Sequence, residues 1–144
     1  MKKSDISSSE TEMSNVIFHL DREICDLVDC IMNGRELTIN LETWPSKKRV
    51  QIFFEEIISY HVVPRLYVIK TESSYCSDGL ICKIENSNYF KWLCDAGMDG
   101  FMSPAALGRI KHYKIEEDDF FIDVLSWDSP DVKVEENVTR RVPR

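Results

Sequence analysis

Three histidines are the side chains on which acid–base or nucleophilic catalysis by this chain would depend: His19, His61 and His112. A hydrolytic triad needs a cysteine or serine nucleophile, a histidine base and an orienting carboxylate. Cys94, His112 and Asp123 supply these three residue types. The residues around Cys94 match no known nucleophile motif, so a cysteine packed in a helix and a histidine packed in a strand are the favoured interpretation. We therefore predict that the chain is not an enzyme.

The cysteines and glycines form none of the motifs that hold metals or nucleotides. The five cysteines include no Cys-x-x-Cys pair, and the five glycines form neither G-x-G-x-x-G nor G-x-x-x-x-G-K. The sequence thus predicts no metal, no cofactor and no small-molecule substrate. The odd number and irregular spacing of the cysteines do not fit the disulfide framework of a secreted domain, so we expect reduced, mostly buried thiols.

The net charge of −7 restricts the partners of the chain. A protein that binds nucleic acid needs a basic face to neutralise phosphates, so we expect no nucleic-acid partner. No apolar run approaches the roughly 18 residues of a membrane span, and Lys2 and Lys3 are not followed by an apolar signal-peptide core. We therefore expect a cytoplasmic protein that does not bind membranes.

Acidic residues are concentrated near the C-terminus. Residues 110–136 hold nine acidic and three basic residues, which accounts for almost all of the net charge. Such a stretch projects a negative potential that steers a basic partner, whereas the alternative is that it only solvates a hairpin turn. Trp44 and Trp127 lie at predicted strand ends and are expected to be partly exposed, whereas Trp92 is expected in the core. The predicted partner-binding residues are Glu116, Glu117, Asp118, Asp119, Trp127, Asp128 and Trp44.

The first half of the chain is patterned as β-strands. Residues 36–44 alternate, with Leu37, Ile39 and Leu41 on one face, as expected of a sheet with one wet side. Asn33-Gly34 precedes this strand and is typical of a type I′ hairpin turn. Residues 24–32 also fit helical spacing, but the hairpin turn favours a strand. Residues 50–54 and 57–63 are predicted as further strands.

The second half adds one helix and a final hairpin. Residues 67–70 and 80–85 are predicted strands around a polar loop, and Asn86 or Ser87 is expected to cap a short helix that ends before Gly97. Residues 98–108 are predicted as a loop, and residues 110–115 and 120–127 as a hairpin. The fold class is α+β, mainly an antiparallel β-meander or curved sheet with one short helix. Its predicted organisation is a disordered leader (1–15), a single globular domain (16–134) and a flexible tail (135–144).

Two blocks of sequence resemble small bacterial immunity proteins. The first block comprises residues 37–44 (LTINLETW), 50–54 (VQIFF) and 57–60 (IISY). The second comprises residues 84–93 (IENSNYFKWL), 111–114 (KHYK) and 122–126 (IDVLS), with Pro130 beyond. Together they cover well under half of the chain, and their motifs are structural, so no partner-contacting residues can be carried over from the family.

The resemblance implies a function. Immunity proteins of polymorphic toxin and contact-dependent growth inhibition systems act in the bacterial cytoplasm as antitoxins, by binding and neutralising a cognate toxin domain. We accordingly expect a toxin inhibitor whose partner is a basic toxin domain. The alternatives are a non-catalytic adaptor or regulatory subunit of a bacterial complex, and a small hydrolase that uses Cys94 and His112.

Overall fold

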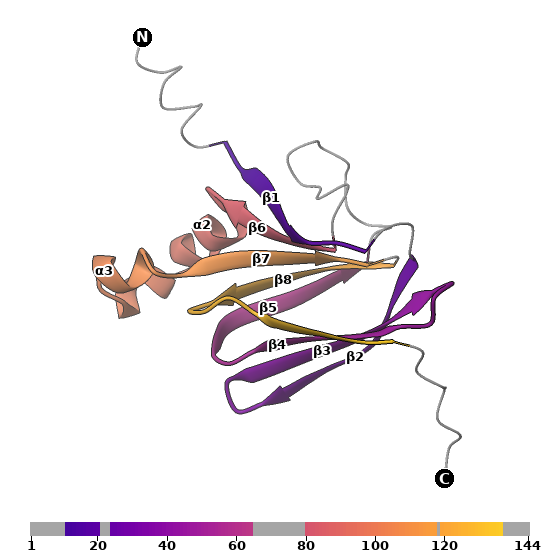
Figure 1. The fold of residues 1–144 in the computed structure, drawn as a ribbon. Coiled ribbons are helices and arrows are strands. Elements are labelled where there is room, and N and C mark those ends of the chain that lie inside the picture. The colour runs from indigo at the N-terminus through magenta and orange to yellow at the C-terminus, as the bar shows by residue number, and fades with distance from the viewer. Residues whose placement is uncertain (1–10, 21–23, 65–79, 118, 137–144) are drawn as a thin grey trace.

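Two antiparallel sheets form the protein. The computed structural model describes residues 11–20, 24–64, 80–117 and 119–136, and the predicted strand at 67–70 and its polar loop lie outside them. One sheet has five strands in the order β1-β6-β7-β8-β5 (Figure 1). These strands are β1 (Met13–Phe18), β6 (Ile81–Glu85), β7 (Lys111–Glu116), β8 (Phe120–Ser126) and β5 (Ile57–Pro64).

The second sheet has four strands in the order β2-β3-β4-β9. They are β2 (Ile24–Asn33), β3 (Glu36–Trp44), β4 (Arg49–Phe54) and β9 (Asp131–Glu135). The α+β, mainly antiparallel class is therefore confirmed. The chain is a meander only through β2-β3-β4 and β6-β7-β8, because β9 returns from the C-terminal part to pair with β4, and β1 pairs with β6. The sequence analysis did not predict β9.

The two sheets bury one apolar face each in a common core. Leu37, Ile39 and Leu41 are completely buried, as the alternation predicted. They belong to the same buried cluster as Ile115 of β7 and Ile122 of β8, in the other sheet. The other face of β3 carries polar residues: Asn40 donates to Asp29 of β2 and accepts from Gln51 of β4, with N–O distances of 2.6 and 3.3 Å. The prediction of one wet face is confirmed.

Residues 24–33 are a strand, as the hairpin signal favoured. Asn33 pairs with Glu36 across a two-residue turn, and Gly34 has a φ of 67°. The turn residues are thus Gly34 and Arg35, not Asn33 and Gly34, and only the glycine has a positive φ. A positive φ confined to the first central residue is the type II′ pattern, so the expected type I′ turn is wrong although the hairpin is confirmed.

The predicted helix is α2 (Asn88–Asp95). Ser87 caps it, because its Oγ accepts the Phe90 amide at 2.9 Å, and Gly97 follows its end with a φ of 119°. The expected loop at 98–108 contains two further short elements, the 3-10 helix η3 (Met98–Phe101) and the one-turn helix α3 (Pro104–Leu107). Within the described residues, no helix has the length and apolarity needed to cross a membrane.

The predicted boundaries of the domain and the predicted state of the cysteines need correction. Strand β1 begins at Met13, which pairs with Glu85, so residues 13–15 belong to the folded domain and not to a leader. Strand β9 ends at Glu135, and residues 137–144 of the predicted tail lie outside the described residues. Cys82 is disulfide-bonded, so the expectation of reduced thiols is wrong for this residue, whereas Cys25, Cys30 and Cys94 form no disulfide.

We predict that Ile39→Ala lowers the free energy of unfolding by about 2–5 kcal/mol, because it leaves a cavity between the two sheets. Thr38→Ala, one residue away on the polar face, is the matched control and should change stability by only about 0.5 kcal/mol. Urea unfolding of both variants checks this. Equal effects of the two substitutions would contradict the assignment of the buried face.

Candidate functional site

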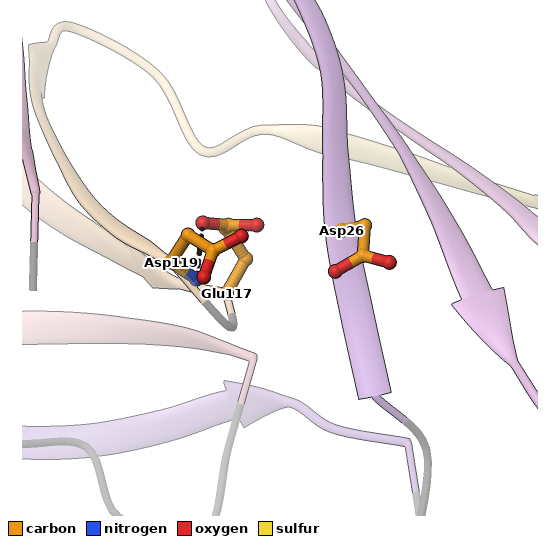
Figure 2. Close-up of side chains that lie close together, drawn as sticks. All are labelled: Asp26, Glu117 and Asp119. Carbon is orange, nitrogen blue, oxygen red and sulfur yellow. Dashed lines mark hydrogen bonds between the residues drawn. The ribbon is translucent and has the colours of Figure 1, made fainter.

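Three carboxylates meet where the β7–β8 turn reaches the second sheet. Asp26 comes from β2, Glu117 directly follows β7, and Asp119 directly precedes β8 (Figure 2). One carboxylate oxygen of each lies within 4.8 Å of the others. The predicted acidic turn therefore exists, and it lies against β2, whose carboxylate the sequence analysis did not select.

Glu117 corrects the expectation that the whole acidic turn is exposed. The residue is only 2% exposed. Its Oε2 accepts the main-chain N–H of Leu27 at 2.8 Å, and its Oε1 accepts that of Asp119 at 2.7 Å. Burial raises the pKa of this carboxyl, and the hydrogen bonds from the main chain oppose that rise. Glu117 thus ties the β7–β8 turn of one sheet to an edge strand of the other.

The carboxylate cluster is explained by this structural role. Carboxylate oxygens are the ligands that magnesium and calcium prefer. Both oxygens of Glu117, however, already accept main-chain hydrogen bonds, so its side chain serves the fold. We assign no ion to the cluster, and the absence of a metal stays a prediction.

The remaining predicted partner-binding residues divide between two ends of the domain. Glu116 is half-buried at the end of β7, Asp119 is exposed, and Asp118 lies outside the described residues. Trp44 is half-buried and pairs with Ile24 of β2, so it belongs to the same end as the acidic turn.

Trp127 and Asp128 follow β8 and therefore lie at the far end of the β7–β8 hairpin from its turn. Trp127 is half-buried under the Arg109 guanidinium, whose carbon is 5.3 Å from the ring centroid, and Asp128 is exposed. The partial exposure expected of Trp44 and Trp127 is confirmed. The structure does not bring Trp127 and Asp128 together with the acidic turn.

Strand β2 exposes apolar side chains that the sequence analysis did not select. The strand lies at the edge of its sheet. Its exposed apolar residues are Ile24, Val28, Ile31 and Met32, which are 43–55% exposed. A signal for them was present: unlike β3, residues 24–32 do not alternate, and a strand with one buried face needs fewer apolar residues than this run contains.

A second group of polar side chains lies on the other face of the five-stranded sheet, under α2. Asp123 of β8 accepts from the Nε2 atoms of His112 and His61, at 2.6 and 2.8 Å. The two histidines are the donors in these hydrogen bonds, because an ionised carboxylate only accepts hydrogen bonds. His112 Nδ1 lies 2.6 Å from the Oγ of Ser87, the cap of α2. The network runs from His61 to the start of the helix.

The pKa of Asp123 reflects this network. Burial by itself would raise the pKa, but the hydrogen bonds from His112 and His61 and the charge of Lys114 together lower it. The ammonium of Lys114 lies 3.8 Å from the carboxylate. Asp123 is thus an ionised, buried carboxylate whose partners are His112, His61 and Lys114.

This geometry bears on the hydrolase alternative. His112 and Asp123 are brought together, but the second ring nitrogen of His112 contacts Ser87 and not Cys94. Burial raises the pKa of the Cys94 thiol, whereas an activated nucleophile needs a lowered one.

Ser87 is also a poor nucleophile in this arrangement. The residue is 7% exposed and its Oγ accepts the Phe90 amide. The neighbouring Asn88 amide donates to Glu12 Oε2 at 2.8 Å, so these two amides do not offer a free oxyanion hole. The geometry favours a structural role for Ser87 and His112 in positioning α2.

An open depression of about 530 Å³ lies beside this network. His61, Tyr89 and Trp92 line it. The ring centroid of Tyr89 lies 4.2 Å from that of His61 and 6.5 Å from that of Trp92. Trp92 is 62% exposed, so the expectation that it belongs to the core is wrong. The hydroxyl of the half-buried Tyr89 lies 2.6 Å from the Oγ of Ser59 in the sheet, whereas Trp92 of the same helix points to solvent.

We predict that Asp123→Asn destabilises the protein by about 1–3 kcal/mol at neutral pH, because the buried His112 and Lys114 lose their charged partner. Since the folded-state pKa of Asp123 is lowered from 3.8, the stabilisation by the ionised carboxylate is complete above that value and is lost as the pH falls below it. The difference in unfolding free energy between the wild type and the variant should therefore shrink below pH 3.8. The exposed Asp128→Asn is the control; a difference that does not depend on pH would contradict the assignment.

Neither protein-family models, nor curated proteins, nor solved structures give a match to the chain. The relation to immunity proteins accordingly stays an expectation from the sequence, and function has to be argued from the surfaces described above.

Proposed function

We propose that this chain is an immunity protein that binds and neutralises a basic bacterial toxin domain. One observation carries the proposal: at one end of an edge strand, exposed apolar side chains lie beside the half-buried carboxylate of Asp26 and the exposed carboxylate of Asp119. We call this end the acidic edge surface and define it as Ile24, Asp26, Val28 and Asp119.

The chemistry of the acidic edge surface suits protein recognition. Ile24 and Val28 are 55% and 48% exposed, and apolar surface of this kind gains free energy when a partner covers it. Asp26 and Asp119 lie beside them, and carboxylates at the rim of an interface steer a basic partner and raise the association rate. The net charge of −7 acts in the same direction at longer range.

The identity of the partner as a toxin comes from the family resemblance. The acidic edge surface supports a basic protein partner, and it would serve an adaptor or regulatory subunit equally well. A cytoplasmic location also belongs to the proposal, and the disulfide at Cys82 counts against it because disulfides are rare in the reducing cytosol. Thiol counting on protein isolated from the cytosol under alkylating conditions addresses this point directly.

The first test uses the neighbouring gene, because an immunity gene directly follows the gene of its toxin. We predict that the C-terminal domain encoded directly upstream inhibits growth and that co-expression of this chain restores growth. A complex that forms without restoring growth would favour the adaptor function. No complex at all would contradict the proposal.

The acidic edge surface predicts how this complex forms. Asp26→Lys with Asp119→Lys should slow association by roughly tenfold at low salt and weaken its dependence on salt. The control pair is Asp95→Lys with Asp99→Lys, which changes the net charge equally on exposed residues of the α2–η3 region. Stopped-flow mixing at two salt concentrations measures both pairs. Equal slowing by the two pairs would show that only net charge matters and would contradict a specific surface.

A further inference from the structure

Within the part of the chain that the structure describes, no strand pairs with the outer edge of the second half of β2. Among the described residues, β2 pairs only with β3, and its other edge faces away from the sheet. We infer that residues 29–33 accept an extended segment of the basic partner as an additional strand. This inference rests on the proposed function and specifies how the partner is held.

The hairpin determines which main-chain groups are free for such a strand. In a two-residue hairpin the flanking pair, here Asn33 and Glu36, exchanges hydrogen bonds, and hydrogen-bonded pairs then alternate with non-bonded ones. Ile31 therefore bonds to β3, whereas Cys30 and Met32 direct their N–H and C=O groups outward. These two residues present two donors and two acceptors at the spacing that an added strand requires.

The first half of the same edge is closed. The Leu27 amide donates to Glu117 at 2.8 Å, and the pairing of β2 with β3 shifts between Leu27 and Asp29. A carboxylate and a bulge are two means by which proteins block an edge strand. Both act before residue 29 and neither acts after it, so the open part of the edge is sharply delimited.

The side chains of this segment indicate the chemistry of the added strand. Ile31 and Met32 are 51% and 43% exposed, and Asp29 lies on the polar face with Asp26 nearer the start of the strand. An added strand with lysine or arginine opposite Asp29 and apolar residues opposite Ile31 would complement them. A second copy of this chain would instead bring like charges together, because β2, with the sequence ICDLVDCIMN, has two aspartates and no lysine or arginine.

Charge distinguishes this edge from the edge formed by β1. Strand β1 also exposes apolar residues, namely Met13, Val16 and Ile17. Its sequence, MSNVIF, contains no acidic residue. A basic strand therefore finds complementary charge within β2 and none within β1.

Amide hydrogen exchange measured by NMR tests the inference without any substitution. The probe is the purified C-terminal domain encoded directly upstream. In the free protein, the amides of Cys30 and Met32 should exchange fast and that of Ile31 slowly; in the complex, Cys30 and Met32 should slow by at least about 100-fold. Protection of Cys30 and Met32 in the free protein would overturn the inference, since the edge would already be covered.

Two substitutions of Met32 provide the matched variants. Met32→Pro removes an outward amide that β3 does not use, a position where edge strands tolerate proline, and Met32→Ala controls for the lost side chain. Met32→Pro should weaken the complex roughly tenfold more than Met32→Ala, and thermal unfolding checks that both variants fold. If the wild type binds and neither the exchange pattern nor Met32→Pro has the expected effect, only the strand addition is overturned. If the wild type does not bind, the proposed function fails and the strand addition fails with it.

Discussion

The mutual burial of two apolar sheet faces is the constraint on which the rest of the structure depends. Leu37, Ile39 and Leu41 of one sheet share a core with Ile115 and Ile122 of the other. Because side chains alternate along a strand, fixing this face also fixes which residues of each strand point to solvent. The exposed apolar residues of β2 are the part of this arrangement that no described strand covers, because β2 lies at the edge of its sheet.

Glu117 connects the packing of the two sheets to the surface on which the proposed function depends. Its buried carboxylate joins the β7–β8 turn to β2 by accepting a hydrogen bond from the Leu27 amide. The burial that this contact requires raises the pKa of the carboxyl. The same contact brings Asp119 beside Asp26 and closes one half of the β2 edge. Glu117 lies in a run of acidic residues that the sequence suggests are all exposed. In the structure it is buried, and it positions the residues of the acidic edge surface (Figure 2).

Local pattern predicted the elements well and their assembly poorly. The alternation of β3, the hairpin at Gly34 and the Ser87 cap of α2 were all predictable, because each depends on residues within a few positions of one another. The pairing of β9 with β4 and of β1 with β6 joins segments far apart in the chain, and periodicity carries no information on such partners. The candidate site was only partly predictable for the same reason: Asp119 lay in the acidic run, whereas Asp26 joins it through the fold.

The described surface also offers the depression beside Trp92, at the α2 end of the domain, as a place for a partner. Chemical-shift mapping of the isotope-labelled chain, titrated with the domain encoded directly upstream, compares the two places in one experiment. The account predicts that the largest changes fall on β2 and the β7–β8 turn, including Asp26 and Asp119. Changes concentrated on Tyr89 and Trp92, with β2 unaffected, would contradict it.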